Sequence, residues 1–110
     1  MRKKGQQGVI VRRGTGDGMY VSLPAAPFEE GDLVRFVVRA DEDSAALLEK
    51  EIEEFDENGR AYIHLTAEDL TGLAADEYVY GVNLTRDGAE PIVIIRSAPF
   101  VVEEAVARDG

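Results

Sequence analysis

The chain contains no cysteine and no tryptophan, and only 1 histidine. Without cysteine it cannot form a disulfide framework, a thiol nucleophile or a zinc–thiolate site. No apolar run is long enough to cross a bilayer, and the basic start MRKKGQQGVIVRRG lacks the apolar stretch of a signal peptide. We therefore expect a protein that folds in a reducing cytoplasm and has no membrane partner.

Basic residues are also scarce. The chain has 12 Lys and Arg against 22 Asp and Glu, which gives a net charge of −10. A field of this sign repels phosphate backbones, so nucleic acid is not an expected partner. Of the basic residues, 5 lie in the first 13 positions, whereas 9 of the acidic ones lie between Asp41 and Glu57. This distribution predicts a basic end and an acidic flank, which favours head-to-tail contact between copies; solvated loops and a basic tail are the simpler alternative.

What is present suffices for one domain. The length of 110 residues and the hydrophobic content of 45% are typical of a single globular unit. Residues 1–7 are basic and polar and are expected to form a flexible tail. Residues 8–107 are expected to form a single β-sandwich domain, and residues 108–110 a C-terminal tail.

Short alternating runs, separated by turn residues, dominate the sequence. The clearest run is Asp32–Arg39, DLVRFVVR, in which every second residue is a large apolar one. Asn58-Gly59 and Asp87-Gly88 are strong turn signals. About seven to nine short strands at this spacing predict an all-β fold, an immunoglobulin-like antiparallel β-sandwich.

The segment from Leu48 to Phe55 fits two structures. Leu48, Ile52 and Phe55 have the spacing of an amphipathic helix, and Ala, Leu, Glu and Lys favour helix. The same apolar residues also alternate with glutamates, as in an exposed strand. Because its neighbours are predicted strands, we interpret the segment as a strand that pairs with Val34–Arg39 on one side and Ala61–Leu65 on the other. Leu48 and Ile52 would then face the core.

Two local features follow this segment. Thr66 is placed to cap a short helical turn through Asp69. Tyr78, in the run DEYVY, resembles the corner tyrosine of immunoglobulin-like sandwiches, whose hydroxyl bonds to upstream backbone. Tyr80 would be the core residue two positions later. The resemblance implies a buried Tyr78 hydroxyl that bonds to backbone near Leu70 to Leu73.

A broader resemblance covers nearly the whole chain. The order GDLVRFVVR, ALLEKEI, an Asn-Gly turn, IHLTAEDLTGL, DEYVYGVNLTRDG and SAPFVVEE resembles small β-sandwich domains of phage and prophage tail or baseplate proteins. The N-terminal domain of phage baseplate upper proteins belongs to that group. The chain departs from the family at Leu70, where Thr is usual after the Asp, and at Gly81, where Asp is usual.

This resemblance implies a non-enzymatic structural or docking module of a phage-derived particle. Such a module would lie in the bacterial cytoplasm during assembly and in the virion afterwards. It carries no catalytic residue, cofactor or metal over to this chain. Its partners would be further copies of itself or other phage structural proteins.

The residues themselves offer little chemistry. His64 shares a strand face with Tyr62, and no serine lies in the context that a catalytic triad needs, so we interpret it as structural. The glycine-rich stretch at residues 14–18 precedes a predicted strand and not the helix that phosphate binding requires. The acidic turns at residues 41–43 and 56–59 could hold calcium if they lay at the same end of the sandwich; solvated loops are the alternative.

Contact surfaces are the remaining prediction. Arg12 and Arg13 are candidate interaction residues, because Gly8 to Arg13 is expected to be one sheet edge and the acidic segment Glu49 to Glu54 the other. Unlike edges favour self-association or docking that weakens as salt rises. The alternative is a carbohydrate- or ligand-binding module. That function would need exposed aromatic side chains, for which the candidates are Tyr20, Phe28, Phe55 and Tyr62.

Overall fold

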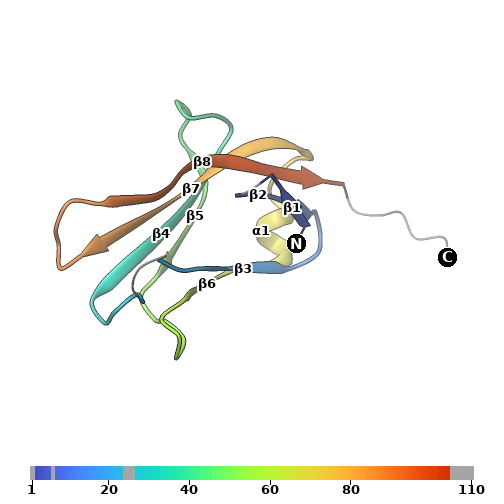
Figure 1. Cartoon of the computed structure of the whole chain (residues 1–110). Helices are drawn as coiled ribbons and strands as arrows, with labels where there is room; N and C mark the ends of the chain where they lie inside the picture. The colour runs from blue at the N-terminus through green and yellow to red at the C-terminus, as the bar shows by residue number, and fades with distance from the viewer. Residues whose placement is uncertain (1, 6, 24–26, 105–110) are drawn as a thin grey trace.

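The computed structural model describes residues 2–5, 7–23 and 27–104 (Figure 1). They form eight strands and one short helix: β1 (Arg2–Lys4), β2 (Gly8–Arg12), β3 (Asp17–Val21), β4 (Asp32–Arg39), β5 (Ala46–Ile52), β6 (Ala61–Leu65), α1 (Ala67–Thr71), β7 (Asp76–Arg86) and β8 (Ile92–Glu103). The predicted all-β class is confirmed.

The strands form two layers of unequal size. A six-stranded sheet has the order β1-β2-β8-β7-β4-β5, and β3 pairs with β6 in a second sheet. Figure 1 shows β3 and β6 as a separate layer beneath the long strands β7 and β8. The predicted sandwich is thus confirmed, with six and two strands in place of the four and three of an immunoglobulin constant domain. One pairing departs from the predicted antiparallel pattern, because β2 runs parallel to β8 with Val9 opposite Phe100.

The core lies between these layers. The alternation predicted for Asp32–Arg39 places every second side chain of β4 in it. The rest comes from β2, β3, β6, β7, β8 and α1, with Phe28 and Leu73 from loops. The largest fully buried side chains are Phe36, Phe100, Ile63, Leu65, Leu70, Leu84, Val34, Val38, Val82 and Val102. A strand whose alternate residues are all apolar can pack only one face against a partner layer, so this pattern fixes which face of each strand points inward.

The ambiguous segment is a strand, as predicted. In β5, Leu48 lies opposite Val38 and Ile52 lies opposite Val34. The side chains of Leu48 and Ile52 both pack against the core. The expected second partner was wrong. Ala61–Leu65 is β6, which pairs with β3 in the other layer and leaves β5 at the edge of its sheet. If β6 joined β5 instead, the apolar face of the large sheet would lose its cover.

Local turn and cap chemistry behaves as predicted. The Thr66 hydroxyl accepts from the Asp69 N–H at 3.0 Å, and the Asp69 carboxylate accepts from the Thr66 N–H at 2.9 Å, which forms a capping box. Asp87 and Gly88 have φ angles of 52° and 73°, and the tight turn that they make joins β7 to β8.

The beginning of the chain differs from the prediction. Residues 1–7 were expected to form a flexible tail, but Arg2–Lys4 form strand β1, which pairs antiparallel with β2. Lys and Arg are weak strand formers, so the sequence carries no local signal for this pairing. At the other end, β8 ends at Glu103. The predicted domain end at residue 107 and the predicted tail over residues 108–110 lie outside the described residues.

Candidate interaction surfaces

The two predicted interaction residues are engaged within the molecule itself. The Arg12 guanidinium lies 3.4 Å from the carboxylate of Glu103. Arg13 donates to the Glu104 carboxylate at 2.8 Å and to the Thr71 carbonyl at 3.0 Å. These contacts join the end of β2 to the end of β8 and to α1. The positive charges of Arg12 and Arg13 are therefore balanced by the chain's own acidic residues.

The sheet edges follow the prediction on one side only. β5 is an edge, and it carries the expected glutamates, of which Glu49 pairs with Arg35 of β4. The run Gly8 to Arg13 was expected to be the opposite edge, but β1 pairs with its first three residues and is the outermost strand of the sheet. An acidic edge therefore exists, whereas Arg12 and Arg13 do not lie on an edge strand.

Aromatic side chains gather on the outer face of the small sheet. Tyr20 of β3 lies opposite Tyr62 of β6, and both rings are about half exposed with 4.9 Å between their centroids. His64 stacks on Tyr62 at 6.2 Å, and the Arg60 guanidinium lies 4.2 Å from the Tyr20 ring centre. We call these four residues the aromatic row. Cation–π and ring contacts of this kind hold side chains in place without burying them.

Gly18 makes room for the aromatic row. A Cβ at this position would lie 2.0 Å from the Tyr62 hydroxyl oxygen, so the ring passes directly over bare backbone. Of the four aromatic candidates named from the sequence, the structure brings Tyr20 and Tyr62 together. Phe28 is buried and stacks with Phe55 at 5.2 Å, away from this face. Arg60 was missed, although it alternates with Tyr62 and His64 in the run RAYIHL, because its contact is with Tyr20 of the distant strand β3.

The tyrosines of β7 differ from the predicted corner. The Tyr78 hydroxyl donates to the Ala74 carbonyl at 2.7 Å, in an exposed position and one residue beyond the predicted backbone stretch. The Tyr80 hydroxyl donates to the Gln7 carbonyl at 2.5 Å. The Tyr80 side chain is buried, and this burial raises the pKa of its hydroxyl. The bond that spans the fold is therefore made by Tyr80, the predicted core residue.

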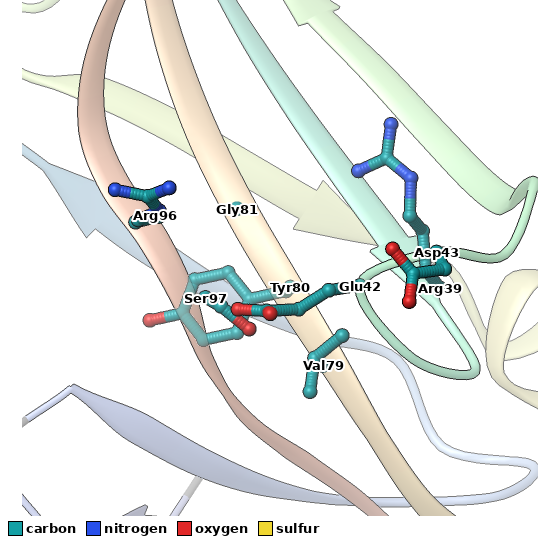
Figure 2. Close-up of a pocket in the computed structure, with 8 residues that line it drawn as sticks. All are labelled: Arg39, Glu42, Asp43, Val79, Tyr80, Gly81, Arg96 and Ser97. Atoms are coloured by element: carbon teal, nitrogen blue, oxygen red, sulfur yellow. The ribbon is translucent and has the colours of Figure 1, made fainter.

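A polar hollow of about 310 Å³ opens over the middle of the large sheet (Figure 2). Figure 2 shows Arg39 and Arg96 on opposite sides of β7, with Gly81 between them. Glu42 and Asp43 reach it from the turn after β4. A register shift between β7 and β8 creates a bulge at Gly81, where a Cβ would lie 3.1 Å from two carbonyl oxygens of β8. This shallow, mixed-charge hollow suits polar contact with another protein.

In each of the two acidic turns, the first carboxylate accepts hydrogen bonds from residues that follow it closely in the chain. Asp41 accepts from the Asp43 N–H and from the Ser44 hydroxyl, each at 2.9 Å. Asp56 accepts from the Arg60 backbone N–H at 2.9 Å, and this bond lowers its pKa. The turns flank opposite ends of β5, so they do not converge. Within residues 2–5, 7–23 and 27–104 there is no group of three or more His, Asp or Glu side chains placed to hold a metal.

Comparison with known proteins gives a structural likeness only. No protein-family model and no curated protein matches the chain. The solved N-terminal domain of phage TP901-1 ORF48 superposes with a TM-score of 0.50 at 17% identity, and the match covers 94% of this chain and 90% of that one. The resemblance to phage baseplate domains predicted from the sequence is thus confirmed in the fold. Among the described residues, no helix is long and apolar enough to span a membrane.

Proposed function

We propose that the chain is a structural and docking module of a phage or prophage particle, and that it acts through protein–protein contacts without catalysis. The observation that carries this proposal is the extent of the likeness to the phage domain. It covers nearly all of both chains, so the two folds correspond over the whole of the domain.

The surface supports the same proposal. The polar hollow over β7 is shallow, and the β5 edge and the exposed rings of the aromatic row offer further surface that another protein can cover. The net charge of −10 argues against nucleic acid as a partner. Copies of the same chain or other tail and baseplate proteins remain as partners. The module would assemble in the bacterial cytoplasm and stay in the finished particle.

A capture experiment tests this function. The purified full chain, fixed to a resin, is offered the separately purified products of neighbouring tail and baseplate genes. We expect it to retain at least one of them. An unrelated β-sandwich of similar size and net charge serves as control, because it shows retention that is driven by charge alone. Equal retention by the control, or retention of none of the tail proteins, would contradict the proposal.

The aromatic row supports a second candidate, a carbohydrate-binding module. Sugar rings present apolar C–H faces that pack on exposed aromatic rings, and Arg60 and His64 would add hydrogen bonds at either end of the tyrosine pair. A glycan array would then show binding that the double variant Tyr20→Ala/Tyr62→Ala loses. Wild-type chain that binds no glycan would remove this candidate and leave the docking function.

A further inference from the structure

Part of β8 has no neighbour on one side. β8 pairs with β7 along most of its length, but β2 covers it only from Phe100 to Glu103. Among the residues that the structure describes, none pairs with Ile92–Ala98 from the side away from β7. The free N–H and C=O groups of such a stretch are a template for another strand. We call the uncharged part of this stretch, Ile92–Ile95, the open edge; Glu90 and Pro91 precede it and Arg96 follows it.

The open edge lacks the charges that usually protect such a strand. It is the uncharged, β-branched run Ile92-Val93-Ile94-Ile95. Val93 is 58% exposed, and Ile92 is nearly as exposed. The edge at β5, by contrast, carries alternating glutamates that repel an identical strand. The sequence thus blocks the β5 edge against pairing and leaves this uncovered part of β8 receptive.

An apolar hollow lies beside the open edge. It has a volume of about 440 Å³, and its walls are Ile92–Ile95 on one side and Met19–Leu23 of β3 and its continuation on the other. Met19, Leu23, Ile94 and Ile95 pack only partly against the core. A strand that pairs with an open edge places alternate side chains in such a hollow, so backbone bonds and apolar burial act together.

Charges at the two ends of the open edge identify the partner. Glu90 and Arg96 are both exposed, and neither forms an ion pair or hydrogen bond within the described residues. If two copies pair antiparallel with Val93 opposite Val93, and this pairing continues past the register shifts that β8 makes against β7, Ile92 lies opposite Ile94. Glu90 of each copy then lies opposite Arg96 of the other. Opposite charges across a strand pair are favourable and like charges unfavourable, so the open edge is complementary to itself.

We propose that the open edge binds the open edge of a second copy, about a two-fold axis at Val93, and joins the large sheets of both copies into one. In this arrangement the open edge of each copy is covered by that of the other, as in an isologous interface. Pro91, which has no N–H, ends the backbone pairing on each side. The inference rests on the proposed function only in requiring action through protein contacts. It is tested on the purified chain, so it can fail while capture of tail proteins succeeds, and the reverse.

Sedimentation of the full chain over rising concentrations gives the first test. A salt concentration near 0.15 M, with a screening length of about 8 Å, limits repulsion between two acidic copies. We expect the mass to rise from 12.0 kDa to twice that value. Val93→Lys should remain a monomer throughout. The matched control Leu47→Lys changes a residue that is 53% exposed on the β5 edge, and should dimerise like the wild type.

Charge reversal tests the register. Glu90→Arg or Arg96→Glu alone should weaken the dimer roughly tenfold, because each turns two favourable cross-strand pairs into two unfavourable ones. The double variant Glu90→Arg/Arg96→Glu should restore it. Wild-type chain that stays monomeric, a dimer that ignores these variants, or a double variant that remains weak would each overturn the proposal.

A crosslink provides a readout that does not depend on the lysine variant folding. The chain has no cysteine, so Val93→Cys introduces a single thiol. A short bifunctional thiol reagent should link this variant to itself, because the two-fold axis brings both copies of residue 93 together. Leu47→Cys should give no such product. Equal crosslinking of the two variants contradicts the proposed interface.

Discussion

Tyr78 and Tyr80 lie two residues apart on β7, but their hydroxyls face different surroundings. The Tyr80 hydroxyl bonds to the Gln7 carbonyl and holds the start of β2 against the sheet, whereas Tyr78 bonds to Ala74 in an exposed position. Tyr80→Phe should therefore lower the free energy of unfolding by about 1 kcal/mol. Tyr78→Phe should cost less than about 0.5 kcal/mol. Urea unfolding of both variants checks this order, and a larger loss in Tyr78→Phe would contradict it.

Asp32 gives the fold a dependence on acid. Its side chain is 2% exposed and accepts two hydrogen bonds from Arg86 and one from the Glu29 N–H, each at 2.8 Å. The Arg86 hydrogen bond is the main reason that the pKa of Asp32 lies below its usual value of 3.8. A carboxyl with a depressed folded-state pKa stabilises the fold above its unfolded-state pKa. That contribution is lost as pH falls through the folded-state pKa.

Asp32→Asn should therefore be less stable than the wild type at pH 7. Its amide carries no charge and has one accepting oxygen, so it cannot replace the carboxylate that accepts both hydrogen bonds from Arg86. The difference should begin to shrink as pH falls below about 3.8, where the unfolded state takes up a proton at Asp32. It should go on shrinking until pH falls through the lower folded-state pKa. Thermal unfolding midpoints of both proteins from pH 7 to pH 2 measure this convergence. Parallel curves over that range would show that Asp32 does not carry the effect.

Residue-level prediction from the sequence succeeded where the interaction is local. The Thr66–Asp69 capping box spans three residues, and its signal lies entirely within the motif. The Tyr80–Gln7 bond joins positions 73 residues apart, and nothing in either neighbourhood specifies the other. The aromatic row could be predicted in part. Alternation placed Tyr62 with His64, but only the pairing of β3 with β6 brought Tyr20 beside them.

Turns show how an element depends on one glycine. Gly59 and Gly88 have φ angles of 71° and 73°, which side chains other than that of glycine adopt at a cost. A Cβ at Gly59 would lie 2.9 Å from the Cα of Pro27, whereas one at Gly88 would meet nothing within 4 Å. Gly88→Ala should therefore cost about 1 kcal/mol, from the backbone conformation alone. Gly59→Ala should cost clearly more, because backbone must also move.

Denaturant midpoints of the two glycine variants test this difference. Equal losses would mean that the loop containing Pro27 shifts freely, and that the contact at Gly59 does not hold the turn beside β6 in place.

At the scale of whole elements, the sequence predicted the strands better than their partners. β4 and β5 were recognisable because alternation and turn residues are local. The assignment of β6 to the second layer was not, because its apolar face would suit either sheet and only the need to cover the large sheet decides. The parallel pairing of β2 with β8 joins strands about 90 residues apart along the chain, as in the Arg12–Glu103 contact with a separation of 91. Local patterns contain no information about such pairings.

For the molecule as a whole, the fold changes how the distribution of charge is interpreted. The basic residues Arg12 and Arg13 were expected to serve association, but they pair with Glu103 and Glu104. The double variant Arg12→Ala/Arg13→Ala should therefore lower stability by at most about 1 kcal/mol per exposed pair. It should leave self-association unchanged. Unfolding and sedimentation of this variant separate the two effects, and a variant that is fully stable but no longer associates would restore the basic-end interface.

The fold class and the phage resemblance could be read from the sequence because both depend on the order of strands and turns, which the chain preserves from end to end. The interaction surface could not be predicted from the sequence. The open edge exists because β2 stops short of covering β8, and strand overlap of this kind is a property of the assembled sheet. The β-branched run Ile92–Ile95 is visible in the sequence, but its exposure is not.

The central claim is that the chain is a component of a phage-derived particle. Mass spectrometry of purified particles from the induced host tests this most directly, with the whole-cell extract measured in parallel. We predict that the chain co-purifies with the tail proteins at a fixed ratio through successive gradient steps. A chain that is abundant in the extract but lost from the purified particles would contradict the claim.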